Sequence, residues 1–211
     1  MASALGGTEE YAANLAMAHL GQREIATLSD NSTRARAVRQ FFAMARDTTL
    51  RLKWWNFATA WVTPAADATA GTGTLKKRFP LPAECLRVRF VENAEDDSWA
   101  IETARVKVGG VEVEAMILVT DFDAPNVCYT RRVESVRLWD VLFLEQFGYE
   151  LAALCARKCG RSTSYAADLR ATAAEKRRTA AGIDSKEKAR EEPRRDTSWV
   201  SARRGRGRVV R

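Results

Sequence analysis

The sequence predicts an α+β fold: a helical bundle with a small antiparallel β region and an extended C-terminal tail. Apolar residues recur at helical spacing before residue 56 and after residue 137, and short alternating segments divided by Gly and Pro lie between them. The helices are expected to be an N-terminal one, a long central one and two C-terminal ones, at about 8–20, 31–55, 138–159 and 162–190. With a β region at about 57–131, they form a single domain over residues 1–192, and a basic tail occupies residues 193–211.

Charge separates the predicted tail from the body. The 211 residues contain 34 Lys and Arg and 27 Asp and Glu, a net charge of +7. Residues 193–211 hold seven arginines and one acid, a net charge of +6, which leaves +1 for the rest of the chain. A tail with this charge favours a nucleic acid or an acidic protein surface as its partner. We find no signal peptide and no apolar run of membrane-spanning length, and we expect assembly inside a cell without a membrane partner.

The N-terminal helix has a start signal and a stop signal. Thr8 can cap it, Glu9 and Glu10 suit the positive end of the helix dipole, and Gly21 fits its C-terminal end. Its expected apolar stripe consists of Tyr11, Leu15 and either Ala18 or His19.

The central helix, residues 31–55, is the expected core helix, and Ser29, Asp30, Asn31 and Ser32 are its candidate N-caps. The arginines of this segment are expected mostly on other faces: Arg34, Arg36, Arg46 and Arg51. Its core face is predicted to contain Val38, Phe41, Phe42, Ala45, Thr49, Leu52 and Trp55. A buried aromatic cluster is expected to follow at Trp54, Trp55, Phe57 and Trp61.

A β-hairpin is the clearest feature of the β region. Gly109-Gly110 suits a two-residue primed turn, because glycine tolerates positive φ. Pairing outward from this turn puts valines on one face and opposite charges on the other, in the pairs Val108–Val111, Lys107–Glu112, Val106–Val113 and Arg105–Glu114. Further strands are expected at 86–90, with a basic face at Arg87 and Arg89, and at 127–131, while Pro80 and Pro82 mark an extended edge or a turn.

The first C-terminal helix, 138–159, is apolar on most sides, which indicates burial either in the core or between subunits. Ser135 is its candidate cap. The second is alanine-rich with a weak stripe at Tyr165, Leu169 and Ala173, and Gly182 is expected to interrupt it before a charged extension.

No residue pattern predicts a catalytic, cofactor or metal site. His19 has no Ser, Cys or Asp motif beside it. Asp140, Glu145 and Glu150 rotate around their helix and do not converge. The four cysteines (Cys85, Cys128, Cys155 and Cys159) form no C-x-x-C pair and are expected to be small buried thiols. We expect a protein that is not an enzyme.

The tail contains apolar residues that a purely solvating segment does not need. Trp199, Val200, Val209 and Val210 lie among its arginines. Two interpretations stay open: a segment that orders on a partner through these anchors, or a disordered basic tail with salt-dependent affinity for nucleic acid.

The N-terminal third resembles the tail tubular protein A family, the head-to-tail adaptors of short-tailed phages, also called gatekeeper or head-completion proteins. The resemblance rests on Leu15, Leu20-Gly21, Ile25, Leu28, Asp30, Arg39, Phe42, Arg46-Asp47, Leu50 and Trp55-Asn56-Phe57, and it continues at Pro80, Leu81, Pro82, Leu86 and Arg87. Where the family often has His-Pro before Trp-Asn-Phe, this chain has Lys53-Trp54.

The resemblance implies a structural protein at the head–tail junction of a virion, assembled in the host cytoplasm. About twelve copies would form a ring below the portal protein, extend the channel for the genomic DNA and carry the tail hub or nozzle. The tail would bind the portal through Arg194, Arg195, Trp199, Val200, Arg203, Arg204, Arg206, Arg208, Val209, Val210 and Arg211.

Two alternatives come from other classes. A nucleic-acid-binding protein would act through the arginine-rich tail, with affinity that falls steeply as salt rises. A cell-wall hydrolase would need two carboxylates facing each other across a cleft, and the spacing of the acidic residues predicts no such pair.

Overall fold

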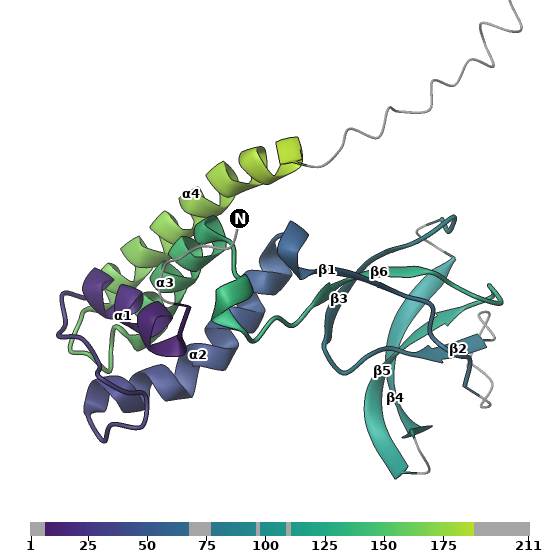
Figure 1. Cartoon of the computed structure of the whole chain (residues 1–211), viewed down its shortest axis with the longest axis horizontal. Coiled ribbons are helices and arrows are strands. Elements are labelled where there is room, and N and C mark those ends of the chain that lie inside the picture. Colours follow the sequence, from purple (N-terminus) through teal and green to yellow (C-terminus); the bar gives the residue numbers. More distant parts are fainter. Residues whose placement is uncertain (1–6, 68–76, 96–97, 109–110, 188–211) are drawn as a thin grey trace, which may run out of the picture.

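The structure is a computed structural model that describes residues 7–67, 77–95, 98–108 and 111–187. Within these residues the chain has the predicted α+β fold, with four α-helices in one part and two three-stranded antiparallel sheets in the other (Figure 1). The predicted C-terminal tail lies outside the described residues.

The helical part consists of α1 (Glu9–His19), α2 (Thr33–Leu52), α3 (Val141–Cys155) and α4 (Thr163–Glu187). Two short 3-10 helices, η1 (Asn56–Ala58) and η2 (Val136–Leu138), precede β1 and α3 respectively.

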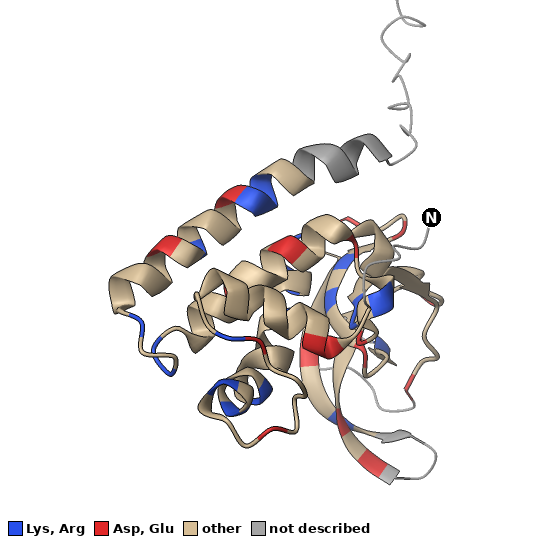
Figure 2. Ribbon diagram, turned by 60° about the vertical axis from the view of Figure 1, so that its left-hand side comes forward, with Lys and Arg blue, Asp and Glu red and all other residues tan. Residues whose placement is uncertain are grey.

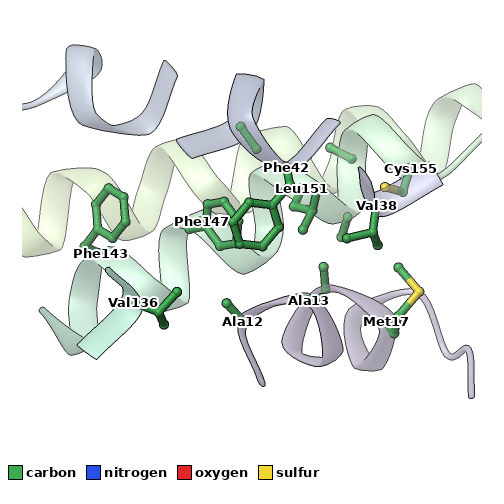
Figure 3. Packing of buried hydrophobic residues seen from close by; sticks show 14 of the residues in the cluster. Ala12, Ala13, Met17, Val38, Phe42, Val136, Phe143, Phe147, Leu151 and Cys155 are labelled. Atoms are coloured by element: carbon green, nitrogen blue, oxygen red, sulfur yellow. The ribbon is translucent and has the colours of Figure 1, made fainter. Parts of the chain in front are cut away.

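Helix α1 has the predicted ends, but the predicted stripe is wrong. The Thr8 hydroxyl accepts a hydrogen bond from the Tyr11 N–H, and Gly21 has a φ of +59° after the last turn. Tyr11, Leu15 and His19 are only half-buried, and Ala18 is exposed. The buried residues are Ala12, Ala13, Ala16 and Met17. Figure 3 shows Ala12, Ala13 and Met17 pointing towards the other helices. Small side chains let α1 pack closely on the other helices, and alanine gives little hydrophobic signal in a sequence.

Helix α2 is capped by Ser32, whose hydroxyl accepts from the Ala35 N–H. The predicted core face is confirmed at Val38, Phe42, Ala45 and Thr49, which are buried. The helix ends at Leu52, earlier than predicted, because Lys53 has an extended backbone.

Three other predictions around α2 are wrong. Leu52 is 47% exposed because the helix ends there, and Trp61, placed by sequence in the buried cluster, is 50% exposed on strand β1. Arg46 is buried and lies against the core side of the helix, where acidic residues surround its guanidinium.

Helix α3 is the central helix of this part and contacts α1, α2 and α4. Its apolar sides are therefore covered within one chain, and burial in the core accounts for them. The predicted start and the predicted cap are wrong: residues 136–138 form η2, and the Asp140 carboxylate accepts from the Leu142 N–H at 2.7 Å, whereas Ser135 makes no side-chain cap.

Helix α4 packs on α3 and continues to Glu187, so Gly182 does not interrupt it as predicted. Leu169 and Ala173 are buried as expected, together with Ala166 and Ala180. Tyr165 is 37% exposed, and its hydroxyl donates to the His19 carbonyl at 2.6 Å.

The strands form two separate sheets of orders β1-β6-β3 and β2-β5-β4. Their bounds are β1 Thr59–Val62, β2 Lys77–Pro80, β3 Cys85–Val91, β4 Trp99–Val108, β5 Val111–Thr120 and β6 Val127–Arg131. The predicted hairpin register is confirmed at all four pairs, and Arg105 Nε lies 3.6 Å from Glu114 Oε1. The turn residues Gly109 and Gly110 lie outside the described residues.

A second apolar core lies between the sheets. Phe79 and Leu118 of one sheet pack with Val88, Val127 and Tyr129 of the other. The helical core is separate and larger, with Phe42, Phe143, Phe147 and Leu151 at its centre (Figure 3).

Candidate functional site

The C-terminal end of α2 is held against β3 by two arginines. Arg89 donates to the Lys53 carbonyl at 2.6 Å, to the Leu50 carbonyl at 3.3 Å and to the Thr130 hydroxyl at 2.6 Å. Arg87 donates to the Arg51 carbonyl at 3.3 Å. The last carbonyls of a helix have no partner within the helix and carry the negative end of its dipole, so a guanidinium is well suited to them.

Arg89 keeps its charge in this position. Burial, and secondly the neighbouring Arg87 charge, lower the pKa of Arg89 to about 10. The group therefore remains protonated at neutral pH and joins α2 to both β3 and β6.

A second link between α2 and the β region is ionic. The Asp47 carboxylate bridges two guanidinium groups, with Oδ1 at 2.8 Å from Arg46 Nε and Oδ2 at 3.0 Å from Arg132 Nε. Arg46 also lies 3.6 Å from Glu134 Oε1. The two oxygens of one carboxylate thus connect α2 to the segment that follows β6.

Aromatic rings fill the space beside these links. The ring centroid of Phe143 lies 5.2 Å from those of Trp55 and Phe57 and 4.9 Å from that of Trp139. All three pairs are arranged edge to face. The indole N–H of Trp55 donates to the Thr49 carbonyl, and that of Trp139 donates to the Val133 carbonyl. Both tryptophans are therefore buried with their polar atoms satisfied.

We call this region the α2 junction: the C-terminal half of α2, strand β3, and residues 130–147. Nine of the nineteen residues that carry the family resemblance lie in it or at its edge: Phe42, Arg46, Asp47, Leu50, Trp55, Asn56, Phe57, Leu86 and Arg87. Gly21 ends α1, and Leu15 lies on α1 beside Gly148 of α3. Of these residues, Asp47 and Arg87 connect α2 to the β region, and the contacts described for them are structural.

Pro80, Leu81 and Pro82, which also belong to the resemblance, line an open groove of about 1240 Å³ in the β region. One wall is strand β5 from Glu112 to Met116, and the other is made by residues 62–67 and 80–83. Apolar lining comes mainly from Val62, Leu81, Val106, Val113 and Met116, and charged lining comes from Asp67, Arg105, Glu112 and Glu114.

The acidic residues considered for catalysis have separate environments. Asp140 caps α3, and Glu145 pairs with Lys176 of α4 at 2.7 Å. In the described part of the chain, no three His, Cys, Asp or Glu residues are grouped so that they could hold a metal ion.

His19 and the cysteines are in unreactive surroundings. His19 stacks on Tyr149 with ring centroids 3.8 Å apart, and burial lowers its pKa. Cys85, Cys128 and Cys155 are buried free thiols as predicted, while Cys159 is half-buried. Burial raises the pKa of Cys155 to about 12, so this thiol stays protonated.

All eleven tail residues predicted to bind the portal, from Arg194 to Arg211, lie outside the described residues. None of the described helices is long and apolar enough to cross a membrane.

Sequence reasoning missed Arg89, Arg132 and Trp139 as residues of the junction. The alternation around Arg89 shows which side of the strand it occupies, and we expected an exposed basic face there. No local pattern indicates that helix carbonyls lie within its reach.

No model of a known protein family matches the chain, and no curated protein matches it. Its function therefore has to be argued from its own residues.

Proposed function

We propose that this chain is a structural head-to-tail adaptor of a phage virion. Copies of it form a ring, of about twelve subunits, below the portal. The ring extends the DNA channel and carries the tail hub or nozzle. The tail residues predicted above bind the portal.

The observation that carries the proposal is where the resembling residues lie. Asp47 of α2 pairs with Arg132 after β6, and Trp55 and Phe57, between α2 and β1, pack on Phe143 of α3. These three residues lie where the helices meet the sheets. A resemblance confined to scattered core positions would be compatible with many folds. A resemblance in the residues that join the two parts supports a shared architecture, and with it the shared structural role.

The position of α4 also supports the proposal. This helix extends beyond the other helices at its C-terminal end (Figure 1) and leads into the arginine-rich tail. Acidic and basic residues alternate along it, including exposed Asp168, Arg170, Glu175 and Arg178 (Figure 2). A long helix of this kind would present the tail at a distance from the body, as docking on a second ring requires.

Subunit contacts in such a ring would have to use other surfaces than α3 beyond its first residue, since the rest of its apolar surface packs on α1, α2 and α4. Exposed apolar side chains are available on α2 at Met44 and Leu52 and before and at the start of α3 at Leu138 and Val141, all between 47% and 58% exposed. We assign the neighbouring subunit to these residues.

The charge of the tail favours one competing function, binding of nucleic acid. Seven arginines in residues 193–211 would release counterions from a phosphate backbone, and affinity would fall steeply with salt.

Mass photometry of the full-length chain with purified portal rings tests the proposal. A Trp199→Ser/Val200→Ser variant keeps every charge, and a second variant changes the tail arginines to glutamine. The adaptor proposal expects the wild-type chain to load the portal as a ring and both variants to lose loading. If the wild-type chain does not load, and DNA binding follows the arginines but ignores Trp199 and Val200, the protein is a nucleic-acid-binding protein.

A further inference from the structure

Strand β5 has one edge that the described residues pair only in part. It pairs with β4 along its whole length, but with β2 only from Ile117 to Thr120. One more bond follows, from the Leu81 N–H to the Met116 carbonyl at 2.9 Å. The Pro82 carbonyl then accepts from the Cys85 N–H, and the chain turns away into β3.

Proline explains why β2 stops here, because Pro82 sits at the turn that leads the chain out of the sheet. No described residue pairs with β5 from Glu112 to Ala115 on this side. In an antiparallel strand the N–H and C=O of alternate residues point to the same side. Since the Met116 carbonyl points towards β2, the backbone groups of Glu114 and Glu112 point to the open edge.

The groove described above lies along this open edge. It offers apolar lining at Val62, Leu81 and Val113 and three acids, Asp67, Glu112 and Glu114, against one base, Arg105. An unpaired strand edge beside an apolar groove is the arrangement that binds an extended peptide as an added strand: backbone bonds supply affinity and side-chain pockets supply selectivity.

We propose that the open edge of β5 binds residues 197–202 from the tail of a second copy of this chain. This segment, TSWVSA, carries no charge and contains the β-favouring residues Thr197, Trp199 and Val200. Its six residues can span the four positions, Glu112 to Ala115, that no described residue pairs on this side, and the groove of about 1240 Å³ is large enough for one indole. Pairs of arginines flank it at 194–195 and 203–204, which complements the acidic lining of the groove.

The occupant comes from a second copy because of where α4 ends. The C-terminal end of α4 lies on the opposite side of the molecule from the hairpin end of β4 and β5 (Figure 1). A neighbouring copy can bring its tail to the groove without crossing the body of the first.

This inference goes beyond the adaptor function, since it gives the tail a second partner besides the portal. The adaptor function and the binding of the tail to β5 can be refuted separately. Binding to the β5 edge needs no portal, and portal loading needs no free β5 edge.

Sedimentation of the full-length chain, without portal, tests the proposal. We expect self-association that weakens at least tenfold in Trp199→Ser and in Glu114→Pro, which removes the N–H that points to the open edge. Thr103→Pro is the matched control: Thr103 pairs with Met116, and its N–H points to the free edge of β4. We expect association within about twofold of wild type in this control.

Hydrogen exchange of the same proteins locates the contact. We expect the amides of Glu112 and Glu114 to be protected in the wild-type chain, increasingly so with protein concentration, and to lose protection in Trp199→Ser. Protection that does not depend on concentration would mean that the chain binds its own tail, and unchanged exchange in Trp199→Ser would mean that the tail does not bind there. Either result overturns the proposal.

If circular dichroism shows that Glu114→Pro is unfolded, a Glu112→Lys/Glu114→Lys variant tests tail binding at the β5 edge in its place. It retains both N–H groups and reverses the charge that faces the arginine pairs. Loss of association that is largest at low salt supports the proposal, and unchanged association contradicts it.

Discussion

Replacing Arg89 by methionine tests whether the α2 junction holds the two parts of the fold together. The change keeps most of the aliphatic stem and removes the guanidinium, so the carbonyls of Leu50 and Lys53 and the hydroxyl of Thr130 lose their donor. Arg87→Met is the matched control on the same strand, since Arg87 is exposed and makes one bond, 3.3 Å long.

The two variants should differ severalfold in their loss of stability. A hydrogen bond to a charged group contributes roughly 1.5–3 kcal/mol, and Arg89 makes two short ones at 2.6 Å. Removing a half-buried charge recovers part of its desolvation cost, so we expect the free energy of unfolding to fall by about 2–4 kcal/mol. For exposed Arg87 we expect a loss of less than about 1 kcal/mol.

Urea unfolding followed by tryptophan fluorescence measures both losses from the shift of the midpoint at constant m value. A loss below about 1 kcal/mol in Arg89→Met, or equal losses in the two variants, would refute the view that Arg89 anchors α2 to the sheets.

Three further predictions concern the helical part. Because burial lowers the pKa of His19, the only histidine, the folded state binds fewer protons than the unfolded state near pH 6; stability should therefore fall as pH drops through about 6.5, and His19→Phe should flatten this dependence in urea titrations. A Cβ on Gly148 would lie 3.4 Å from Leu15, an ordinary contact, so Gly148→Ala should raise the free energy of unfolding by up to about 1 kcal/mol, whereas Gly21→Ala, at a φ of +59°, should lower it by roughly 1–2 kcal/mol. Phe143→Ala, at the centre of the aromatic cluster, should cost about 3–5 kcal/mol in urea unfolding, and a loss below 2 kcal/mol would contradict the described packing.

Local signals predicted local structure well in this chain. The hairpin register followed from a glycine pair and matching valines and charges, and all of its pairs are confirmed. Thr8 and Gly21 marked the ends of α1 because capping depends on residues next to one another.

Tertiary features were the ones that sequence reasoning missed. The packing face of α1 consists of alanines, which show little periodicity, so larger residues were chosen wrongly. Arg46 was expected to avoid the core, but Asp47 and Glu134 pair with its guanidinium where it is buried, and the second of these lies 88 positions away in sequence. The separation of the strands into two sheets, which leaves β5 partly unpaired, also depends on pairing between distant segments.

In the candidate site too, local features were predicted from the sequence and features that depend on distant segments were missed. Pro80 and Pro82 were identified as marks of an edge or a turn, but the open groove beside them could not be foreseen, because its other wall comes from β5. The junction residues Trp55 and Phe57 stood out by their aromatic character and, together with Asn56, by family resemblance. Arg89 and Trp139 did not, since their partners lie on other elements.

The central positions of β6 and α3 have a consequence for how the chain folds as it leaves the ribosome. Strand β6 lies between β1 and β3, and α3 contacts α1, α2 and α4, yet only residues 132–140 separate these two central elements. Neither the β1-β6-β3 sheet nor the helical core can close before this late stretch emerges. The first 120 residues therefore keep apolar surface exposed until this stretch is synthesised. The β2-β5-β4 sheet is the exception in that all of its strands have been synthesised by then, so that it can pair earlier. During synthesis, this is the interval in which the nascent chain is most exposed to aggregation and most dependent on chaperones.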